Sequence, residues 1–130
     1  MKFLLDTHAL LWYTLGAPQL SRKAESLILN AGNDIYVSPA SYWEIAIKIS
    51  IGKLTVEQPL EKFLDTCEQQ YGFQLLAISA AHAVAVSELA FPKNHRDPFD
   101  RLLVAQAIVE QMQIIGSDTA LDAYPVTRIW

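Results

Sequence analysis

The sequence has a single cysteine, Cys67, and no long apolar run. One cysteine excludes an internal disulfide, and this scarcity is typical of a protein from a reducing cytoplasm. Lys, Glu, Gln or His interrupts every apolar stretch before it reaches the length of a membrane span, so no membrane segment is expected. The N-terminus also lacks the basic segment, apolar core and small-residue cleavage pattern of a signal peptide. We therefore expect a soluble cytoplasmic protein.

Glycine and proline are also few, and they occur singly as punctuation between other segments. There is no internal repeat, low-complexity tract or linker. No Gly-x-Gly-x-x-Gly motif follows an apolar segment, and Gly52-Lys53 lacks the rest of a phosphate-binding loop. The glycine-rich motifs of nucleotide-binding proteins are therefore absent.

Positive charge is in the minority, with 10 Lys and Arg against 14 Asp and Glu and a net charge of −4. This balance argues against binding nucleic acid through bulk positive charge. It is compatible with a site where carboxylates bind metal cations that in turn attract phosphate. The 130 residues, of which 52% are hydrophobic, predict one domain spanning residues 1–130 around one core.

Short segments rich in β-branched and aromatic residues alternate with segments of helical pattern. This alternation predicts parallel βαβ units and a three-layer α/β/α domain. The expected strands are Phe3–Leu5, Ile35–Val37, Phe73–Ala77, Gln113–Ile115 and Val126–Ile129. The expected helices are Ala9–Leu15, a segment opening at Leu20-Ser21 and stopping at Asn30-Ala31-Gly32, Ser38–Ile51, Pro59–Gln70, Ser79–Leu89 and Asp97–Gln111.

Two acids lie just beyond predicted strands. Asp6 follows the first strand and Asp118 the fourth. The crevice outside the carboxyl ends of parallel strands is where α/β proteins bind ligands. The alternative is that each acid caps a following helix, Asp118 that of Thr119–Asp122.

Glu44 shares a helical stripe with Ala40, Ile47 and Ile51, which predicts a buried face. Helical side chains lean toward the N-terminus of their helix, so Glu44 can reach back toward Asp6. The alternative is a surface ion pair with Lys48 at i+4.

Asp97-Pro98-Phe99-Asp100 contains two acids with different expected roles. Asp97 precedes a proline at the first helical position, which predicts a helix cap. Asp100 heads an inward-facing stripe through Leu103 and Ala107, so it is the better candidate ligand.

Four acids from separate segments, Asp6, Glu44, Asp100 and Asp118, thus converge on one predicted sheet edge. Clustered like charges raise one another's pKa, and a divalent cation relieves the repulsion. Carboxylate oxygen suits Mg²⁺ or Mn²⁺ rather than zinc.

Other polar and aromatic residues have simpler interpretations. Lys93–Arg96 and Arg101 form a basic patch that could hold a nucleic-acid backbone, although a solvated loop is the simpler reading. His82 is expected to be structural, and His8 either approaches the site or packs in the first helical turn. The aromatic side chains at helical spacing are expected in the core or an interface; they are Trp12, Tyr13 and Trp43.

The sequence resembles the PIN-domain ribonucleases, and among them the VapC-type toxins of toxin–antitoxin pairs. The matching stretches, in order along the whole chain, are Leu4-Leu5-Asp6-Thr7-His8, Ser41-Tyr42-Trp43-Glu44-Ile45, Asp97-Pro98-Phe99-Asp100-Arg101-Leu102 with Ala105-Gln106-Ala107, Ser117-Asp118 and Tyr124-Pro125-Val126 to Trp130. The chain departs from many relatives in having Gly116, where they carry a threonine two residues before the last acid.

The resemblance implies a five-stranded parallel sheet in the order 3-2-1-4-5. It also implies an Mg²⁺ or Mn²⁺ site formed by Asp6, Glu44, Asp100 and Asp118, an RNA substrate, a homodimer and an inhibitory antitoxin protein. The function predicted is a metal-dependent endoribonuclease. One rival is a catalytically weak module of the same fold that binds RNA or protein. A second rival is a phosphotransferase or phosphatase acting through Asp6, which is weaker because the position two residues on is His8 rather than an acid.

Overall fold

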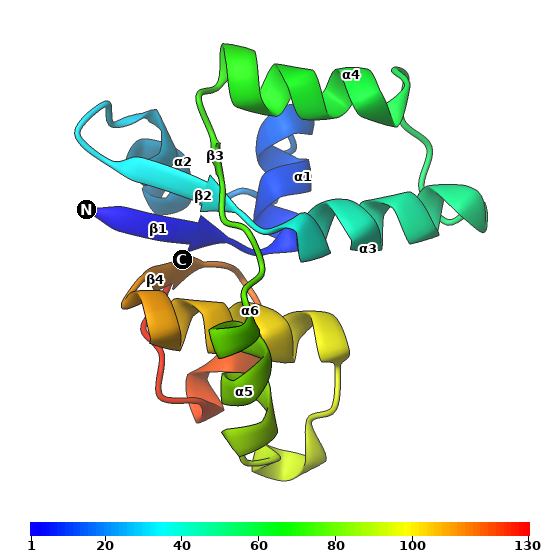
Figure 1. Cartoon of the computed structure of the whole chain (residues 1–130). Coiled ribbons are helices and arrows are strands. Elements are labelled where there is room, and N and C mark those ends of the chain that lie inside the picture. The colour runs from blue at the N-terminus through cyan, green and yellow to red at the C-terminus, as the bar shows by residue number, and fades with distance from the viewer.

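A computed structural model describes residues 1–130 (Figure 1). Its centre is a five-stranded sheet in the order β3-β2-β1-β4-β5, in which every neighbouring pair is parallel. The strands are β1 (Lys2–Leu5), β2 (Asp34–Val37), β3 (Gln74–Leu75), β4 (Gln113–Ile115) and β5 (Arg128–Ile129). The parallel α/β sheet and its strand order are therefore confirmed.

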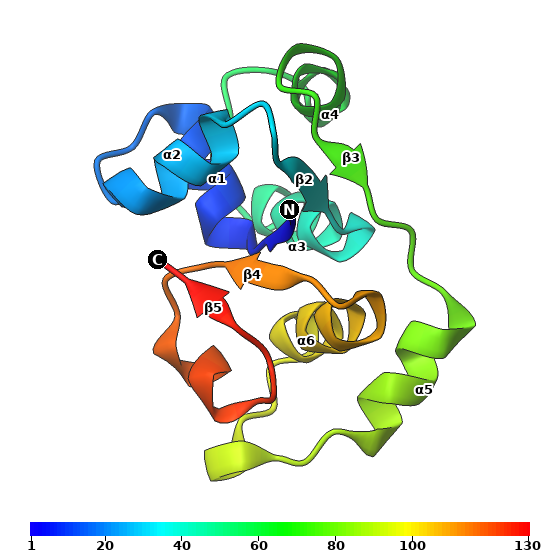
Figure 2. The ribbon, with the colours of Figure 1, turned by 90° about the vertical axis from the view of Figure 1, so that its left-hand side faces the viewer.

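Helices cover both faces of this sheet (Figure 2). The α-helices are α1 (Thr7–Leu15), α2 (Arg22–Leu29), α3 (Pro39–Ser50), α4 (Leu60–Asp65), α5 (Ala80–Glu88) and α6 (Pro98–Glu110). Short 3-10 helices are η2 (Pro92–Asn94) and η3 (Thr119–Ala123), and η1 (Thr66–Gln70) is a π-helix that continues α4. The predicted helix Pro59–Gln70 is therefore an α-helix followed directly by a π-helix.

Alternation along β1 divides the core into two parts. Phe3 and Leu5 pack with α1, α2 and α3, whereas Leu4 packs with α6 and β4 on the other face. Successive side chains of a strand point to opposite faces, so a strand buried on both sides is apolar throughout. This explains why residues 3–5 of the central strand β1 are all apolar.

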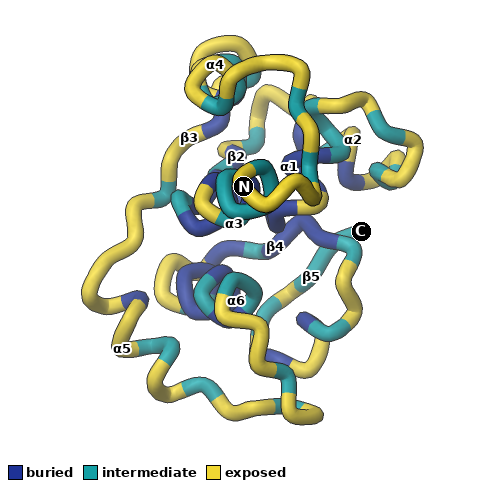
Figure 3. The backbone as a smooth tube through the Cα atoms, turned by 90° about the vertical axis from the view of Figure 1, so that its right-hand side faces the viewer, coloured by how far each residue is buried: buried dark blue, intermediate teal, exposed yellow.

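The two edge strands are shorter than their patterns predict. β3 comprises two residues instead of Phe73–Ala77, and β5 comprises two instead of Val126–Ile129. Each pairs with a neighbour on one side only, and a short edge strand leaves few backbone groups unpaired. Figure 3 shows that α5, beyond β3 along the chain, is mostly exposed.

None of the helices combines the length and the apolar character that a membrane span requires.

Candidate acidic site at the carboxyl ends of the strands

The carboxyl ends of β1 and β4 place Asp6 against the backbone of Gly116. Leu5 is in register with Ile115, and the Asp6 N–H donates to the Ile115 carbonyl at 3.0 Å. A Cβ added at Gly116 would collide with Oδ2 of Asp6 and lie 2.8 Å from its Cγ. The loop after β4 therefore packs directly on the Asp6 carboxylate, and only glycine leaves room for it.

Asp6 also caps α1, as the alternative reading of this residue predicted. Its Oδ1 accepts a hydrogen bond from the Ala9 N–H at 2.7 Å. The side chain is nearly inaccessible, and burial raises the pKa of Asp6 to about 6. The Ala9 hydrogen bond and the charge of His8 lower this pKa, while the charges of Asp100 and Asp118 raise it further. Capping therefore occupies one oxygen of the Asp6 carboxylate, whose pKa is also raised by the charges of two other candidate acids.

Asp97 is the cap of α6, as predicted, whereas Asp100 stays a candidate ligand. Asp97 Oδ1 accepts from the N–H groups of Phe99 and Asp100 at 2.9 and 3.0 Å and so caps α6. Asp100 lies in the first turn of α6, half-buried, and burial raises its pKa to about 6, with the charges of Asp97 and Asp118 adding to the rise. Asp100 Oδ2 contacts Nε2 of His95 at 3.2 Å.

The cap assignment yields a direct test. Asp97→Ala removes the acceptor for two backbone N–H groups and should lower the free energy of unfolding by about 1 kcal/mol, whereas Asp97→Asn keeps the acceptor and should cost a few tenths. Chemical denaturation measures both. A cost for Asp97→Asn equal to that for Asp97→Ala would contradict the cap assignment.

The position of Glu44 on α3 differs from the predicted one. The buried face of α3 is formed by Ala40, Ser41, Tyr42 and Ile45, whereas Ile51 is 58% exposed. The predicted stripe of Ala40, Glu44, Ile47 and Ile51 is therefore wrong, because the helix is rotated so that Glu44 lies at the border of the buried face.

Two neighbours hold the Glu44 carboxylate. The Thr7 hydroxyl donates to Oε1 at 2.6 Å, and Lys48 Nζ lies 3.2 Å from Oε2, so the predicted alternative pair with Lys48 is present. Since Thr7 follows Asp6 directly, the start of α1 links these two acids. Thr7 is buried and also lies within hydrogen-bonding distance of Ser41.

Asp118 is exposed and caps the short helix η3, with Oδ1 accepting from the Ala120 N–H at 2.9 Å. The Arg128 guanidinium lies nearby. It binds Asp122 through two hydrogen bonds of 2.8 and 2.9 Å and donates from Nη1 to the Gly116 carbonyl at 3.0 Å. The pKa of Arg128 is raised, chiefly by Asp122 and further by the charges of Asp118 and Asp6. Arg128 is thus a fixed positive charge beside the acids.

The four predicted acids are near one another but are not drawn into one cage. The charges of Asp100 and Asp118 raise the pKa of Asp6, the charge of Asp118 raises that of Asp100, and Glu44 is linked to the residue after Asp6 by the Thr7 hydroxyl. No three His, Cys, Asp or Glu side chains converge closely enough to hold a metal ion together. Each of the four acids already has at least one oxygen occupied, by the N–H groups of Ala9 and Ala120, by Lys48 or by His95.

Several residues around these acids carry weak or no signals in the sequence. In the sequence, Thr7 and Arg128 belong to no cluster of charged residues, and Tyr124 has the pattern of an aromatic residue in the core. His95 lies within the predicted basic patch, yet its ring lies between Asp100 and the Tyr124 hydroxyl, with distances of 3.2 and 2.8 Å. Only the family resemblance included Thr7, Tyr124 and Arg128, in its matching stretches at residues 4–8 and 124–130.

The other histidines and aromatics have structural partners. His82 is buried, and its Nδ1 accepts from the Ser79 N–H while its Nε2 lies 3.2 Å from Glu110, so the structural role is confirmed. His8 stacks on Trp12 with ring centroids 5.3 Å apart. Trp43 is 62% exposed and packs edge-on against Phe99, which places it outside the core.

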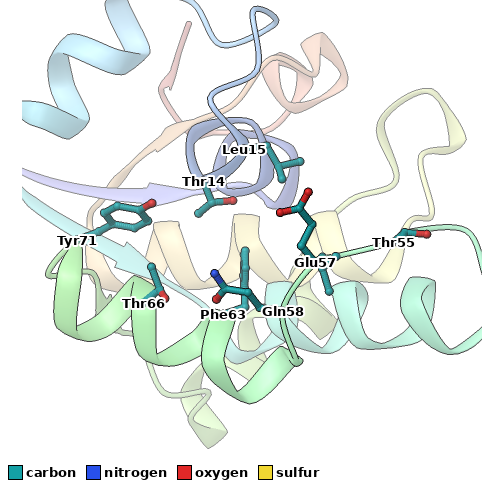
Figure 4. Close-up of a pocket in the computed structure, with 9 residues that line it drawn as sticks. Thr14, Leu15, Thr55, Glu57, Gln58, Phe63, Thr66 and Tyr71 are labelled. Atoms are coloured by element: carbon teal, nitrogen blue, oxygen red, sulfur yellow. The ribbon is translucent and has the colours of Figure 1, made fainter.

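A separate pocket of about 300 Å³ lies between α1, α4 and the segment joining α3 to α4 (Figure 4). Thr14 and Leu15 line it from the C-terminal end of α1, whereas Asp6 is at the N-terminal end of this helix. Phe63 and Tyr71 contribute apolar surface. The pocket therefore does not include the candidate acids.

The fold and the acidic sheet edge together define the class, a three-layer α/β protein with carboxylates at the ends of its central strands. The PIN domain family model matches residues 3–126, and the chain belongs to the PIN domain family. No curated protein matches the sequence.

Several solved structures share the fold. A chain of VapBC2 from Rickettsia felis, bound to a DNA fragment from their promoter, has a TM-score of 0.72 and 17% identity over 99% of this chain and 98% of its own. A chain of FitAcB from Neisseria gonorrhoeae has a TM-score of 0.69 and 19% identity over 98% of this chain and 96% of its own. A chain of VapBC-1 from nontypeable Haemophilus influenzae has a TM-score of 0.67 and 16% identity over 99% of this chain and 97% of its own. At these identities the likeness concerns the fold alone.

Proposed function

We propose that this chain, as one nuclease domain over residues 1–130, is a divalent-metal-dependent endoribonuclease and the VapC-type toxin of a toxin–antitoxin pair. The observation that carries the proposal is the gathering of acids at one edge of the sheet, where the charges of Asp100 and Asp118 raise the pKa of Asp6 and the charge of Asp118 raises that of Asp100. Burial raises the pKa of Asp6 and of Asp100 to about 6, and nearby carboxylates raise it further. Such groups lower their free energy by binding a cation.

The donor set fits Mg²⁺ or Mn²⁺, because these ions prefer hard oxygen ligands and the four candidate ligands are carboxylates. Asp6, Glu44, Asp100 and Asp118 would hold the ion, directly or through water. Of the two nearby histidines, His95 is already shared between Tyr124 and Asp100, and His8 stacks on Trp12. A zinc site would need more nitrogen or sulfur ligands than the edge contains.

When bound, a divalent ion at such a site supplies activation of water for hydrolysis of a phosphodiester. The chain's own residues prepare the position. Asp6 is fixed by its cap hydrogen bond and by the Gly116 backbone, and Thr7 orients Glu44. Arg128 contacts the Gly116 carbonyl, and the Lys93–Arg96 loop contacts Asp100 through His95, so we expect these basic segments to contact RNA phosphates. The expected products carry 5′-phosphate and 3′-hydroxyl ends.

Incubation of purified protein with total RNA tests this function. Cleavage is expected with Mg²⁺ or Mn²⁺ and not with EDTA, and mapping of the ends should reveal 5′-phosphates. Metal-independent cleavage, or products with 2′,3′-cyclic phosphate ends, would contradict the proposal.

Metal binding can also be measured without RNA. Saturating Mn²⁺ should stabilise the protein, by about 2.7 kcal/mol at 100 times the dissociation constant. Glu44→Ala should reduce this gain, and the exposed Glu61→Ala on α4 serves as the matched control. Comparing each variant with and without EDTA separates the metal effect from the loss of the Lys48 pair.

The same titration distinguishes the alternative function, a catalytically weak module that binds RNA or protein. RNA binding without any stabilisation by Mn²⁺, and without cleavage, would favour that module.

The proposed partners are an antitoxin protein and a second copy of this chain. The antitoxin is supported by the fold shared with structures described as toxin–antitoxin complexes, including one from Klebsiella pneumoniae. The homodimer is implied by the family resemblance. Sedimentation of the purified protein, alone and co-expressed with the product of an adjacent small reading frame, tests both.

A further inference from the structure

Beyond the acids themselves, a chain of hydrogen bonds runs from a buried arginine to Asp100. Arg101 is 5% exposed, and its Nη1 donates to the Tyr124 hydroxyl at 3.2 Å. That hydroxyl lies 2.8 Å from Nδ1 of His95, whose Nε2 lies 3.2 Å from Oδ2 of Asp100. We propose that His95 is a positioning residue, held by Tyr124 and Arg101 so that its Nε2–H donates to Asp100 and aims that carboxylate at the metal site. This inference rests on the proposed function in that Asp100 is taken as a metal ligand.

The arginine fixes one hydrogen-bond direction in this chain. A guanidinium has donors only, so the Tyr124 oxygen accepts from Arg101. The hydroxyl keeps its own proton, and we infer that it donates this proton to Nδ1 of His95. With Nδ1 accepting, the proton of the ring is on Nε2, which donates to Asp100. Every group in the chain is satisfied by this arrangement.

Arg101 is well placed to set this direction because it cannot easily move. Its Nη1 also donates to the Ala90 carbonyl at 2.6 Å and its Nη2 to the Leu89 carbonyl at 3.3 Å. The Phe91 ring packs 4.0 Å from the centre of the guanidinium. The end of α5 and the segment after it thus fix the arginine, which fixes the tyrosine.

The backbone before His95 adopts an uncommon conformation that brings the ring over α6. Lys93 and Asn94 have φ values of 50° and 59°, in the left-handed region. The His95 N–H closes a turn onto the Pro92 carbonyl at 2.9 Å. Non-glycine residues in this region are rare, and they persist where surrounding contacts enforce them. Here the turn precedes His95, whose ring lies between Tyr124 and Asp100.

The same logic applies to metal sites generally, where a partner of a ligating side chain orients it and its loss weakens metal binding by about 10- to 100-fold. In most such pairs the ligand is a histidine held by a carboxylate. In this protein the carboxylate is the candidate ligand and the histidine is the partner. Asp100 lies in the first turn of a helix, where its side chain would otherwise choose among rotamers.

The tautomer can be observed directly in the metal-free protein. In ¹⁵N-labelled protein above neutral pH, His95 should show a protonated Nε2 and an unprotonated Nδ1. Tyr124→Phe removes the hydroxyl proton and should abolish this preference. An Nδ1–H tautomer or a doubly protonated ring in the native protein would overturn the inference, whether or not metal binds.

Two substitutions at His95 separate positioning from packing. Gln places its amide nitrogen near the position of Nε2 and can still donate to Asp100, whereas Asn is too short to reach it. Calorimetric titration with Mn²⁺ alone should give a dissociation constant within about twofold of native for His95→Gln and about tenfold weaker for His95→Asn. Circular dichroism establishes that both variants are folded.

The outcomes separate the two proposals. Equal Mn²⁺ affinity for His95→Asn and native protein would overturn the positioning role while leaving the metal site in place. Equal losses in His95→Gln and His95→Asn would also overturn it, since the donor to Asp100 would then be irrelevant. Absence of Mn²⁺ binding by native protein would instead overturn the proposed metal site, and the tautomer measurement would still decide how His95 is held.

Discussion

Asp6→Asn is expected to abolish metal-dependent RNA cleavage and at the same time to stabilise the metal-free protein. At about pH 7.5 the gain in the free energy of unfolding should be about 1 to 3 kcal/mol. Asparagine keeps an oxygen that can accept the Ala9 N–H, so the cap of α1 survives. It removes a buried negative charge and its repulsion with Asp100 and Asp118. A functional site that costs stability is a common trade-off.

The pH dependence of this gain follows from the pKa of Asp6. Burial raises it to about 6 in the folded protein from 3.8 in an unperturbed chain, so the folded state holds the proton more tightly. The penalty for a charged Asp6 is therefore absent below the unfolded value, grows as the pH rises toward 6, and is complete above it. The advantage of Asp6→Asn should be largest near neutral pH and should shrink at about pH 4.

Urea denaturation at both pH values, in EDTA, measures this effect, and an RNA assay with Mg²⁺ measures the loss of cleavage. Asp65→Asn, on the exposed surface of α4, is the matched control for removing one negative charge without burial. An equal gain from both substitutions would mean that net charge, not burial, is responsible. Retained Mg²⁺-dependent cleavage in Asp6→Asn would contradict the proposed role of this residue.

Gly116→Ala is the second substitution with a large expected effect. The backbone of Gly116 does not have a positive φ, so alanine meets no conformational barrier there. Its Cβ would instead collide with the Asp6 carboxylate, which must then move from its position. Overpacking of this kind typically costs about 1 to 3 kcal/mol of stability. Displacement of Asp6 should also lower cleavage and Mn²⁺ binding.

A double-mutant cycle shows whether the collision is the cause. In an Asp6→Ala background, the two nearest carboxylate atoms are gone and the remaining Cβ is 3.3 Å from the added methyl group. Gly116→Ala should therefore cost much less in that background, giving a coupling of about 1 to 3 kcal/mol. An identical cost in both backgrounds would show that Asp6 is not what the methyl group meets.

These effects bear on the one departure from the family pattern. Many relatives carry a threonine at the position of Gly116, and in this chain the Asp6 carboxylate fills the space that a side chain would take. Arg128 donates to the carbonyl of the same glycine. Both the space beside the Gly116 Cα and its carbonyl are therefore occupied by neighbouring side chains.

The sequence predicted the sheet well because its strands follow from local patterns, and the same patterns indicated which acids follow the strand ends. Apolar runs ending at a carboxylate identified β1 with Asp6, and the Asp-Pro pair separated the cap Asp97 from Asp100. The Glu44 stripe was wrong because apolar spacing in α3 fits more than one helical face, and only packing against β1 and α1 selects the face of Tyr42 and Ile45.

The amino-acid sequence by itself determined which segments become strands and helices and which acids follow the strand ends, since these depend on residues near one another in the chain. Only the tertiary structure decided what surrounds the acids. The Gly116 backbone against Asp6, Thr7 between Asp6 and Glu44, and the path from Arg101 to His95 each join segments that strand pairing and loop closure bring together. No local pattern records such contacts, because the physical requirement is a shared position in space.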